Sequence, residues 1–558
     1  MQKKVLIEKK VCFDRCIERG MPALQYKARI CKYARLQTLF KAGAQLSPAS
    51  TLLFKIKGDF RMIILPPQVI EALERLESAG FEAYVVGSCV RELVLGNSPQ
   101  DFDIATNAEI NDILFAFREY RISDEGMARG EILVTILGMV IQISPYRREV
   151  VGNRVMYAED LETDLARRGF TMNAMAYSPK AGLIDPYDGR GALTGDIKQV
   201  VAIGENVTVN VKVGGKPTAE TIYDMSRSFT IQPSRLLQAI RYCSEDEYEI
   251  EEQTRNCMRA NVACFDYADA DSIRGELQRI VMGKYAARAL EKNADILKYV
   301  LPEIEPCIDF AQMSLHHDFD VWTHICKAVG FSMPEPEIRF AMLFHDLGKP
   351  DCMFVDNRGY GHFKGHGERG RLLAEGIMRR LEFPKNMIDE ISWLIYHHDV
   401  PIPEERKELK ALIRELGATD LRNLLQCEIA DSRARKNDSE PEQTVKLRAS
   451  LAALNEIMET GECYEISQLA ITKRELMDRR LVSSDAEAEQ LMNALFDIVL
   501  DKPSFNNRLM LLDIAEKSKS KLEQIEAERM RAAQEKAARE RTKREKGRRA
   551  EPVFKRKK

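Results

Sequence analysis

The sequence predicts an α+β protein, in which a head of mixed strands and helices precedes an all-α body. Two observations support this prediction. Up to about residue 200, short apolar runs alternate with amphipathic stretches and turn signals, whereas beyond about residue 233 the pattern is almost entirely helical. A chain of 558 residues, 45% hydrophobic and 30% charged, is also too long for one core and typical of a soluble globular protein with about three or four domains.

The first elements of the head follow from local signals. Residues 66–80 are predicted to form a helix, because their apolar residues share one face, Pro67 lies near the start and Gly80 ends the run. The next elements are predicted to be a strand at 82–86, a helix at 89–96, a strand at 101–105 and a hairpin at 131–143. The hairpin turns near Gly138. At the other end of the chain, residues 441–515 are predicted to form amphipathic helices that continue the body.

Composition excludes several classes of protein. No apolar run reaches the roughly 18 residues that a membrane-spanning helix needs, and the start lacks the apolar core of a signal peptide, so a cytoplasmic protein without membrane contact is expected. The twelve cysteines are scattered, which fits a reducing compartment better than a disulfide framework. Cys12 and Cys16 lie close together, but no histidine or second cysteine pair accompanies them, so a zinc site is not predicted there.

Both ends of the chain are basic. Residues 1–61 have a charge balance of +10 and residues 516–558 one of +9, which leaves −22 for the part between them. Basic ends suit phosphate binding, because each contact with a phosphate releases counterions, but a solvated helix or a disordered tail has the same composition. The first 61 residues are read either as a real basic extension or as the result of a misassigned start, with Met62 as the natural first residue.

Two aspartates in the predicted strand at 101–105 need a reason. Side chains alternate across a strand, so Asp101 and Asp103 share one face while Phe102 and Ile104 lie on the other. Two neighbouring carboxylates are unfavourable unless a cation lies between them, and their hard oxygen atoms suit Mg²⁺. The pair therefore predicts a magnesium site.

The stretch before these aspartates is suited to phosphate. Gly87 allows a backbone to approach a ligand closely, and Ser88 begins a helix whose free N–H groups favour an anion. Arg91 lies one turn further along the same face, where its guanidinium would grip a triphosphate. A phosphate-binding turn beside a pair of metal-binding carboxylates is typical of enzymes that transfer nucleotides. In that reaction two metal ions activate a hydroxyl and stabilise the leaving pyrophosphate.

With three further segments, this stretch resembles the head of the class II tRNA nucleotidyltransferase and poly(A) polymerase family. The segments are DLARRGFTMNAMAYSPKAGLIDPYDGRGAL (164–193), PSRLLQAIRY (233–242) and DSIRGELQRIV (271–281), so that the resemblance covers roughly residues 62–310. It implies a polymerase-β-like fold and the addition of C and A nucleotides, from CTP and ATP, to the 3′ end of tRNA without a nucleic-acid template. The implied cofactor is Mg²⁺.

The resemblance also implies roles for individual residues. Arg167, Arg168 and Asn173 would hold the nucleotide. Arg235 would contact the incoming base, and Arg241, in the same helix, would belong to the nucleotide site. Five positions depart from the usual family pattern, which has acids there, and they carry Glu92, Gln142, Gly169, Ile231 and Gln232. An extra segment, 205–228, precedes the base-reading helix. Since glutamine both donates and accepts hydrogen bonds, base reading is expected to be altered rather than lost.

The eight histidines form a second group, because all of them lie between His316 and His398. Histidine and aspartate side chains on neighbouring helices converge on a divalent transition metal that activates water against a phosphoester. The pattern resembles the HD phosphohydrolase domain, which accompanies this kind of head in some bacterial enzymes. The resemblance implies a metal core of His324, His345, Asp346 and Asp431, with His366 and His397 as ligands of a second metal. Ni²⁺ or Mn²⁺ is the expected ion.

These patterns divide the chain into seven expected parts. They are a basic extension (1–61), a nucleotidyltransferase head (62–204), an insertion (205–232), a helical neck (233–310), an HD domain (311–440), C-terminal helices (441–515) and a charged tail (516–558). Three functions stay open. The first is a tRNA 3′-end nucleotidyltransferase with an HD phosphohydrolase domain, of which a poly(A) polymerase is a variant. The second is an HD phosphohydrolase whose altered head only docks RNA, and the third is a non-catalytic RNA-binding protein. The oligomeric state is left open.

Overall fold

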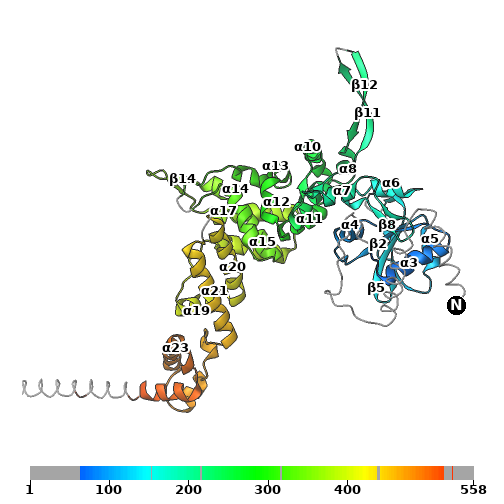
Figure 1. The fold of residues 1–558 in the computed structure, drawn as a ribbon. Helices are drawn as coiled ribbons and strands as arrows, with labels where there is room; N and C mark the ends of the chain where they lie inside the picture. The colour runs from blue at the N-terminus through cyan, green and yellow to red at the C-terminus, as the bar shows by residue number, and fades with distance from the viewer. Residues whose placement is uncertain are drawn as a thin grey trace, which may run out of the picture. The chain divides into compact units, whose positions relative to one another are not determined.

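A computed structural model describes residues 63–151, 154–213, 216–314, 317–436 and 440–518, together with residues 520 and 531. The chain divides into two units, Met1–Met62 and Ile63–Lys558, and every described residue belongs to the second. The predicted extension at 1–61 and most of the predicted tail at 516–558 therefore lie outside the described residues. The described part has the α+β architecture that the sequence predicts, with a mixed sheet first and helices after it (Figure 1).

The head is built on a seven-stranded sheet with the strand order β3-β4-β5-β2-β1-β8-β9. The strands are β1 (Ala83–Val86), β2 (Phe102–Thr106), β3 (Arg121–Ser123), β4 (Ile132–Ile136), β5 (Met139–Pro145), β8 (Ala176–Ser178) and β9 (Gly182–Ile184). Among these strands β2 and β5 form the one parallel pair, and the other neighbours are antiparallel. The predicted hairpin is present as β4 and β5, with Leu137 and Gly138 in left-handed conformations between them.

Helices of the head alternate with these strands along the chain, and the first three of them pack against the sheet. They are α3 (Pro67–Ser78), α4 (Ser88–Leu95), α5 (Ile110–Ala116), α6 (Leu161–Ala166) and α7 (Gly189–Thr194). The predicted helix at 66–80 is confirmed as α3, which turns Val69, Leu73 and Leu76 into the core. Because apolar residues three and four apart share one helix face, this spacing both forms the helix and sets the face it buries.

Three hairpins of the described chain lie outside the seven-stranded sheet, one of them the short pair β14 (Phe354–Val355) and β15 (Gly361–His362) in the helical part. The other two precede the helical part, and strands β6 (Arg147–Val151) and β7 (Arg154–Tyr157) form the first of these. The extra segment of the sequence forms the other, an antiparallel ribbon of β11 (Glu205–Val213) and β12 (Lys216–Asp224). Directly after the ribbon come α8 (Ser226–Ile231) and α9 (Arg235–Glu245), the helix that contains the predicted base-reading arginine. Strands β10 (Gln199–Val200) and β13 (Glu249–Ile250) form a short parallel pair beside α9.

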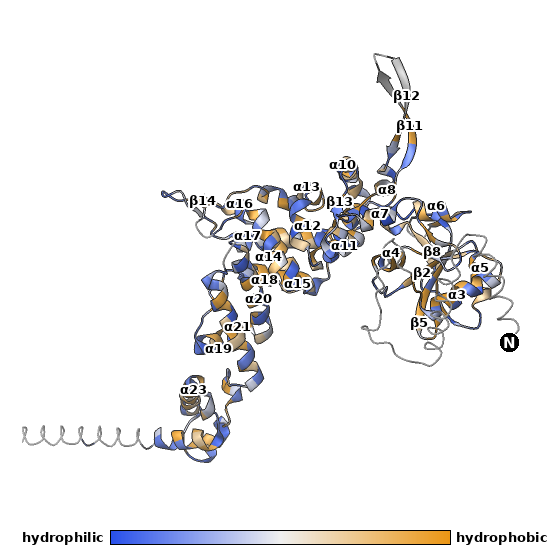
Figure 2. Ribbon diagram, in the orientation of Figure 1, coloured by the Kyte–Doolittle hydropathy of each residue, from blue (hydrophilic) through white to orange (hydrophobic). Residues whose placement is uncertain are grey.

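From α9 onward the described chain is almost entirely helical. The helices up to Ala434 are α10 (Glu252–Ala260), α11 (Ala270–Met282), α12 (Ala286–Lys292), α13 (Ala294–Leu297), α14 (Val321–Phe331), α15 (Pro336–Phe344), α16 (Lys349–Cys352), α17 (His366–Arg380), α18 (Lys385–His397), α19 (Arg406–Leu416) and α20 (Ala418–Ala434). One cluster of buried apolar side chains runs through the sheet and on through these helices, from Leu65 to Ala434. Figure 2 shows hydrophobic residues along the strands of the sheet and on helices such as α14 and α15.

The last helices have apolar clusters of their own. Helix α21 (Glu442–Thr460) packs against α19 and α20 around one cluster, which includes Leu409 and Leu454. Helices α22 (Lys473–Asp478) and α23 (Asp485–Asp501) enclose another, centred on Leu476 and Phe496. No helix in the described ranges is long and apolar enough to cross a membrane.

Candidate functional site

The turn between β1 and α4 lies directly over one of the two predicted metal ligands. Val86, the last residue of β1, pairs with Asp103 on β2, so the turn at Gly87 begins beside that aspartate. Gly87 has a φ of 81°, and a Cβ built there would lie 2.9 Å from Nη1 of Arg168 and 3.6 Å from Oδ2 of Asp103. A side chain at this position would collide with the guanidinium, so only glycine allows the backbone this close to both charged groups.

The two aspartates differ in exposure. Asp101 precedes the first residue of β2 and is exposed, whereas Asp103 lies within the strand and is half-buried. Burial raises the pKa of Asp103, and the nearby Arg168 opposes that rise. The charge of Asp101 also raises the pKa of Asp103, so the two carboxylates act on each other, and their oxygen atoms are the kind of donor that suits Mg²⁺. The residues present therefore fit the predicted ion.

A buried carboxylate binds the two arginines of the RRGF segment, which is residues 167–170. Asp164 on α6 accepts hydrogen bonds from Nε of Arg167 (3.1 Å), from Nε and Nη2 of Arg168 (3.1 and 2.7 Å) and from the backbone N–H of Arg147 (3.0 Å). Burial alone would raise the pKa of Asp164, but the charges of Arg168 and Arg167 lower it to about 2. Arg168 is thereby fixed between Asp164 and the turn at Gly87.

Asp164→Asn is expected to destabilise the fold by about 2–4 kcal/mol, because two largely buried guanidinium groups lose the charge that compensates them. The pKa of Asp164 falls from 3.8 to about 2 on folding, so its contribution is present above about pH 4 and is lost as pH falls toward 2. Urea unfolding at pH 7 measures the change. Asp160→Asn is the control, because Asp160 is the exposed N-cap of α6 and asparagine caps a helix equally well. Equal stability of both variants would contradict the expectation.

A second network joins the head to α9. Arg91 donates from Nη1 to Oδ1 of Asn173 (2.7 Å), and Asn173 donates from Nδ2 to the hydroxyl of Tyr242 (2.8 Å). Glu92, one of the departures from the family pattern, accepts from Nε and Nη2 of Arg91 at 3.1 and 3.0 Å. Two predicted nucleotide-binding residues, Arg91 and Asn173, are thus brought together, and Glu92 offsets the charge of the arginine.

The two predicted arginines of α9 are not presented to solvent. Arg241 is 4% exposed and forms ion pairs with Glu245 (2.8 Å) and Glu276 (2.7 Å). Arg235 is 8% exposed, and its guanidinium is folded back against Gly169. Both guanidinium groups are therefore engaged by groups of the protein itself, and their predicted contact with a nucleotide stays a prediction.

Three charged residues near the head site were not predicted. Glu131 forms an ion pair with the buried Arg147 at 2.8 Å, and both side chains act on the pKa of Asp103. Asp164 was also missed, although the sequence contains a signal for it: an aspartate three and four residues before two arginines faces both of them on a helix. Gln142 lies opposite Asp103 in the parallel pair, so an amide occupies the position where the family usually has an acid.

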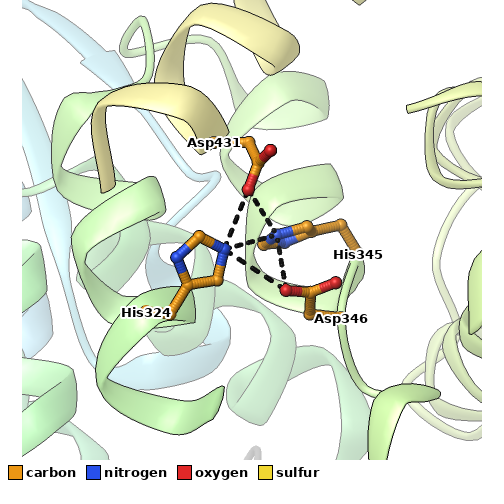
Figure 3. Close-up of side chains that lie close together, drawn as sticks. All are labelled: His324, His345, Asp346 and Asp431. Atoms are coloured by element: carbon orange, nitrogen blue, oxygen red, sulfur yellow. Dashed lines mark hydrogen bonds and ion pairs between the residues drawn. The ribbon is translucent and has the colours of Figure 1, made fainter. Parts of the chain in front are cut away.

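The predicted metal core of the helical part lies in one place. His324 comes from α14, His345 and Asp346 directly follow α15, and Asp431 comes from α20. Figure 3 shows the four side chains pointing toward one another. Nε2 of His324 lies 2.8 Å from Oδ1 of Asp431, 3.2 Å from Oδ2 of Asp346 and 3.3 Å from Nε2 of His345. All four residues are buried and have one donor atom each within 4.8 Å of the others.

A second group shares Asp346 with the first. Nε2 of His366 lies 3.5 Å and Nε2 of His398 lies 3.9 Å from Oδ1 of Asp346, and the two nitrogen atoms are 3.0 Å apart. Oδ2 of Asp346 faces the first group while Oδ1 faces the second. This carboxylate is therefore placed to join two metal positions.

Backbone contacts fix the orientation of three of these histidines. Nδ1 of His345 donates to the carbonyl of Met342 (2.8 Å), and His366 and His398 make the same kind of contact with carbonyls three residues earlier, at 2.8 and 2.6 Å. A carbonyl only accepts, so the hydrogen lies on Nδ1 and the Nε2 lone pair points into the site. Lone pairs that face one another at these distances suit a cation between them.

The second group contains His398 and not the predicted His397. Nδ1 of His397 contacts the carbonyl of Trp393 at 2.8 Å, and its ring stacks on Trp393 with centroids 4.2 Å apart. His397 belongs to neither group, because neighbouring residues of a helix differ in direction by about 100°. Lys349 was also not predicted: its Nζ lies 2.5 Å from Oδ2 of Asp346 and donates to Oε1 of Gln312 at 2.9 Å.

Comparison with known protein families agrees with both halves of this description. Residues 83–199 match the family model of the poly A polymerase head domain. Residues 321–441 match that of the HD domain. The first range contains the Gly87 turn, both aspartates and the RRGF segment, and the second contains both histidine groups.

Curated relatives match part of the chain. The CCA-adding enzyme of Lactobacillus delbrueckii subsp. bulgaricus is 30% identical over 230 residues, which are 40% of this chain and 52% of that enzyme. The CCA-adding enzyme of Geobacillus thermodenitrificans is 25% identical over 290 residues, 49% of this chain and 66% of the enzyme. The chain thus spans about half the length of the first of these relatives. Between them, the two matches establish likeness rather than shared activity.

A solved structure shows the same fold. The Bacillus stearothermophilus CCA-adding enzyme, solved in complex with CTP, superposes with a TM-score of 0.54 at 20% sequence identity. The match covers 82% of this chain and 100% of that one. At this identity the likeness establishes the fold.

Proposed function

Since the chain combines a poly A polymerase head domain with an HD domain, we propose that it adds C and A nucleotides to the 3′ end of tRNA without a template. One observation supports this most directly. The turn at Gly87, the half-buried Asp103 and the fixed Arg168 meet at one point, which gives a phosphate-binding backbone, a metal ligand and a cation. CTP, ATP and tRNA are the proposed partners, and a cytoplasmic location belongs to the proposal because tRNA is the substrate.

In this proposal, Asp101 and Asp103 hold Mg²⁺, which when bound activates the attacking hydroxyl and stabilises the leaving pyrophosphate. The chain's own residues orient the nucleotide. The free N–H groups after Gly87 face the triphosphate, and Arg168 lends its charge to the same region while Asp164 keeps it in place. Arg91 and Asn173 extend the site toward α9.

Incubation of the purified protein with tRNA lacking its terminal CCA, with Mg²⁺ and each labelled nucleotide in turn, tests the proposal. Incorporation of C and then A supports it. Runs of A alone would identify a poly(A) polymerase. No incorporation at all, from folded protein, would leave the head without the proposed activity.

For the HD domain we propose metal-dependent hydrolysis of a phosphoester such as a 2′,3′-cyclic nucleotide. The donor set supports a transition metal such as Ni²⁺ or Mn²⁺, because imidazole and carboxylate side chains converge without a hard-oxygen cage. The first ion would be held by His324, His345, Asp346 and Asp431, and a second by Asp346, His366 and His398. A bound transition metal lowers the pKa of water and so supplies a nucleophile at neutral pH.

The exchange of His397 for His398 in this ligand set is testable. His398→Gln is expected to reduce bound Mn²⁺ from two ions to one per chain, because it removes one of three donors of the second group. His397→Gln is the matched control and should leave two ions, since that ring stacks on Trp393. Metal titration by calorimetry measures both. If the His397 variant lost an ion and the His398 variant did not, the assignment would be reversed.

A second candidate function has one observation in its favour. Arg235 and Arg241 are both engaged inside the protein, which fits a head that docks RNA without reading a base. The chain would then be an HD phosphohydrolase. The nucleotide-addition assay above separates the two candidates.

We also propose a division of the chain into domains. The head occupies 62–204, the insertion 205–232, the neck 233–310, the HD domain 311–440 and the C-terminal helices 441–515.

A further inference from the structure

Gly169 leaves a space that another side chain fills. It has a φ of +79°, and a Cβ built there would lie 2.5 Å from Nε, 2.6 Å from Cζ and 2.8 Å from Cδ of Arg235. Real Cβ atoms do not approach other atoms so closely, so any side chain at 169 requires the guanidinium of Arg235 to move. The glycine and the arginine are therefore two halves of one packing arrangement.

Arg235 is not free to move out of this position without loss. Its Nη1 donates to the carbonyl of Ser228 at 3.0 Å, and its Nη2 donates to the carbonyl of Arg167. The Ser228 hydroxyl in turn donates to the carbonyl of Ile203 at 2.7 Å, and the N–H of Ile203 donates to the carbonyl of Gly169 at 2.9 Å. These bonds close a ring that ties the start of α9 to the turn that follows α6.

The partners of this guanidinium are unusual for a buried arginine. They are neutral carbonyl groups, and among the described residues no carboxylate forms an ion pair with Arg235. Burial without a compensating acid lowers the pKa of Arg235 to about 10. A buried charge without an acidic partner is costly, so the hydrogen bonds to the carbonyl groups of Ser228 and Arg167 are what offset the burial of this guanidinium.

The object that Arg235 fixes is the turn of Arg167, Arg168 and Gly169. Arg167 provides the carbonyl that Arg235 binds, and its side chain shares Asp164 with Arg168. A shift of this turn would move Arg168 relative to the turn at Gly87. It would therefore disturb the part of the site that meets the phosphates, which every nucleotide has in common.

We infer that Arg235 is a positioning residue, which holds the Arg167–Gly169 turn in the phosphate-binding geometry, and that it does not read the base. The inference rests on the proposed nucleotidyl transfer. It makes a specific statement about selectivity: loss of Arg235 weakens the use of every nucleotide by the same factor, whereas loss of a base reader changes the ratio between nucleotides.

The kinetic test uses full-length Arg235→Ala with CTP, ATP, UTP and GTP. We expect kcat/KM to fall by about tenfold to a hundredfold for each nucleotide that the natural protein uses, because a small displacement of the phosphate site has effects of this size. The affinity for inorganic triphosphate, measured by calorimetry below the unfolding temperature, should fall with it. A change in the ratio of CTP to UTP or ATP to GTP, with triphosphate affinity unchanged, would overturn the inference.

A thermal cycle tests the packing independently of activity. Gly169→Ala should lower Tm clearly more than Gly182→Ala, since Gly182 has nearly the same φ, +75°, but no atom within 4 Å of a built Cβ. In the background of Arg235→Ala, the excess cost of Gly169→Ala should disappear, because the colliding side chain is gone. Additive effects of the two substitutions on Tm would overturn the proposed packing of Arg235 against Gly169. If the natural protein added no nucleotide, this cycle would still test the packing of Arg235 against Gly169, and only the proposed activity would fail.

Discussion

Asp101→Ala and Asp103→Ala are each expected to reduce nucleotide incorporation by at least about a thousandfold. Removing a metal ligand forfeits several kcal/mol of transition-state stabilisation, and each 1.4 kcal/mol or so corresponds to a factor of ten. The fold should be kept, because Asp101 is exposed and burial raises the pKa of Asp103, which means that its charge is not favoured where it lies. Primer extension on tRNA lacking CCA measures the activity, and circular dichroism the fold.

Asp124→Ala is the matched control for these variants, because Asp124 is an exposed aspartate of the same domain. It should incorporate nucleotides at the natural rate. Natural rates in both the Asp101 and the Asp103 variant would remove the active site from this strand, and the proposed chemistry of the head with it.

Asp346→Asn is expected to abolish hydrolysis at the HD site. Nucleotide addition should stay within about twofold of the natural rate, because a substitution at one of two independent sites leaves the other site's activity unchanged. Asp346 faces both ligand groups, so one substitution weakens both metal positions. Both activities should be assayed with Mg²⁺ alone and with added Ni²⁺ or Mn²⁺. The combination of His345→Ala with Asp346→Ala should behave in the same way.

Asp356→Asn provides the control for the HD site, because Asp356 pairs with the exposed His362 outside both groups. It should leave both activities intact. If Asp346→Asn lost nucleotide addition while folded, the two sites would not be independent. If the natural protein hydrolysed no phosphoester with any metal, the HD site would be better explained as structural or regulatory.

The parts of the structure that the sequence predicted are those fixed by local pattern or by residue chemistry. Helix α3 and the β4–β5 hairpin follow from apolar spacing and turn residues, which act over a few positions. The core of His324, His345, Asp346 and Asp431 could be named because all eight histidines lie in one stretch of the chain and this stretch resembles the HD domain.

The parts that were missed depend on contacts distant in sequence. Adjacent histidines at 397 and 398 are equivalent in one dimension, and only the packing of α18 turns His398 toward Asp346. The direction of the Arg235 side chain likewise depends on a glycine 66 residues earlier in the chain. Sequence pattern names a residue's type and element, but the choice between a site-facing and an inward-facing rotamer belongs to tertiary packing.

The unbroken apolar core described above has a consequence for how heat and ligands act on the protein. The buried cluster from Leu65 to Ala434 contains side chains of the sheet around Asp103 and of the helices around Asp346. Residues that share one core tend to lose their structure together, so chemically independent sites would share a single melting unit. A metal ion that binds the folded HD site would then protect nucleotide addition against heat, although it never meets a nucleotide.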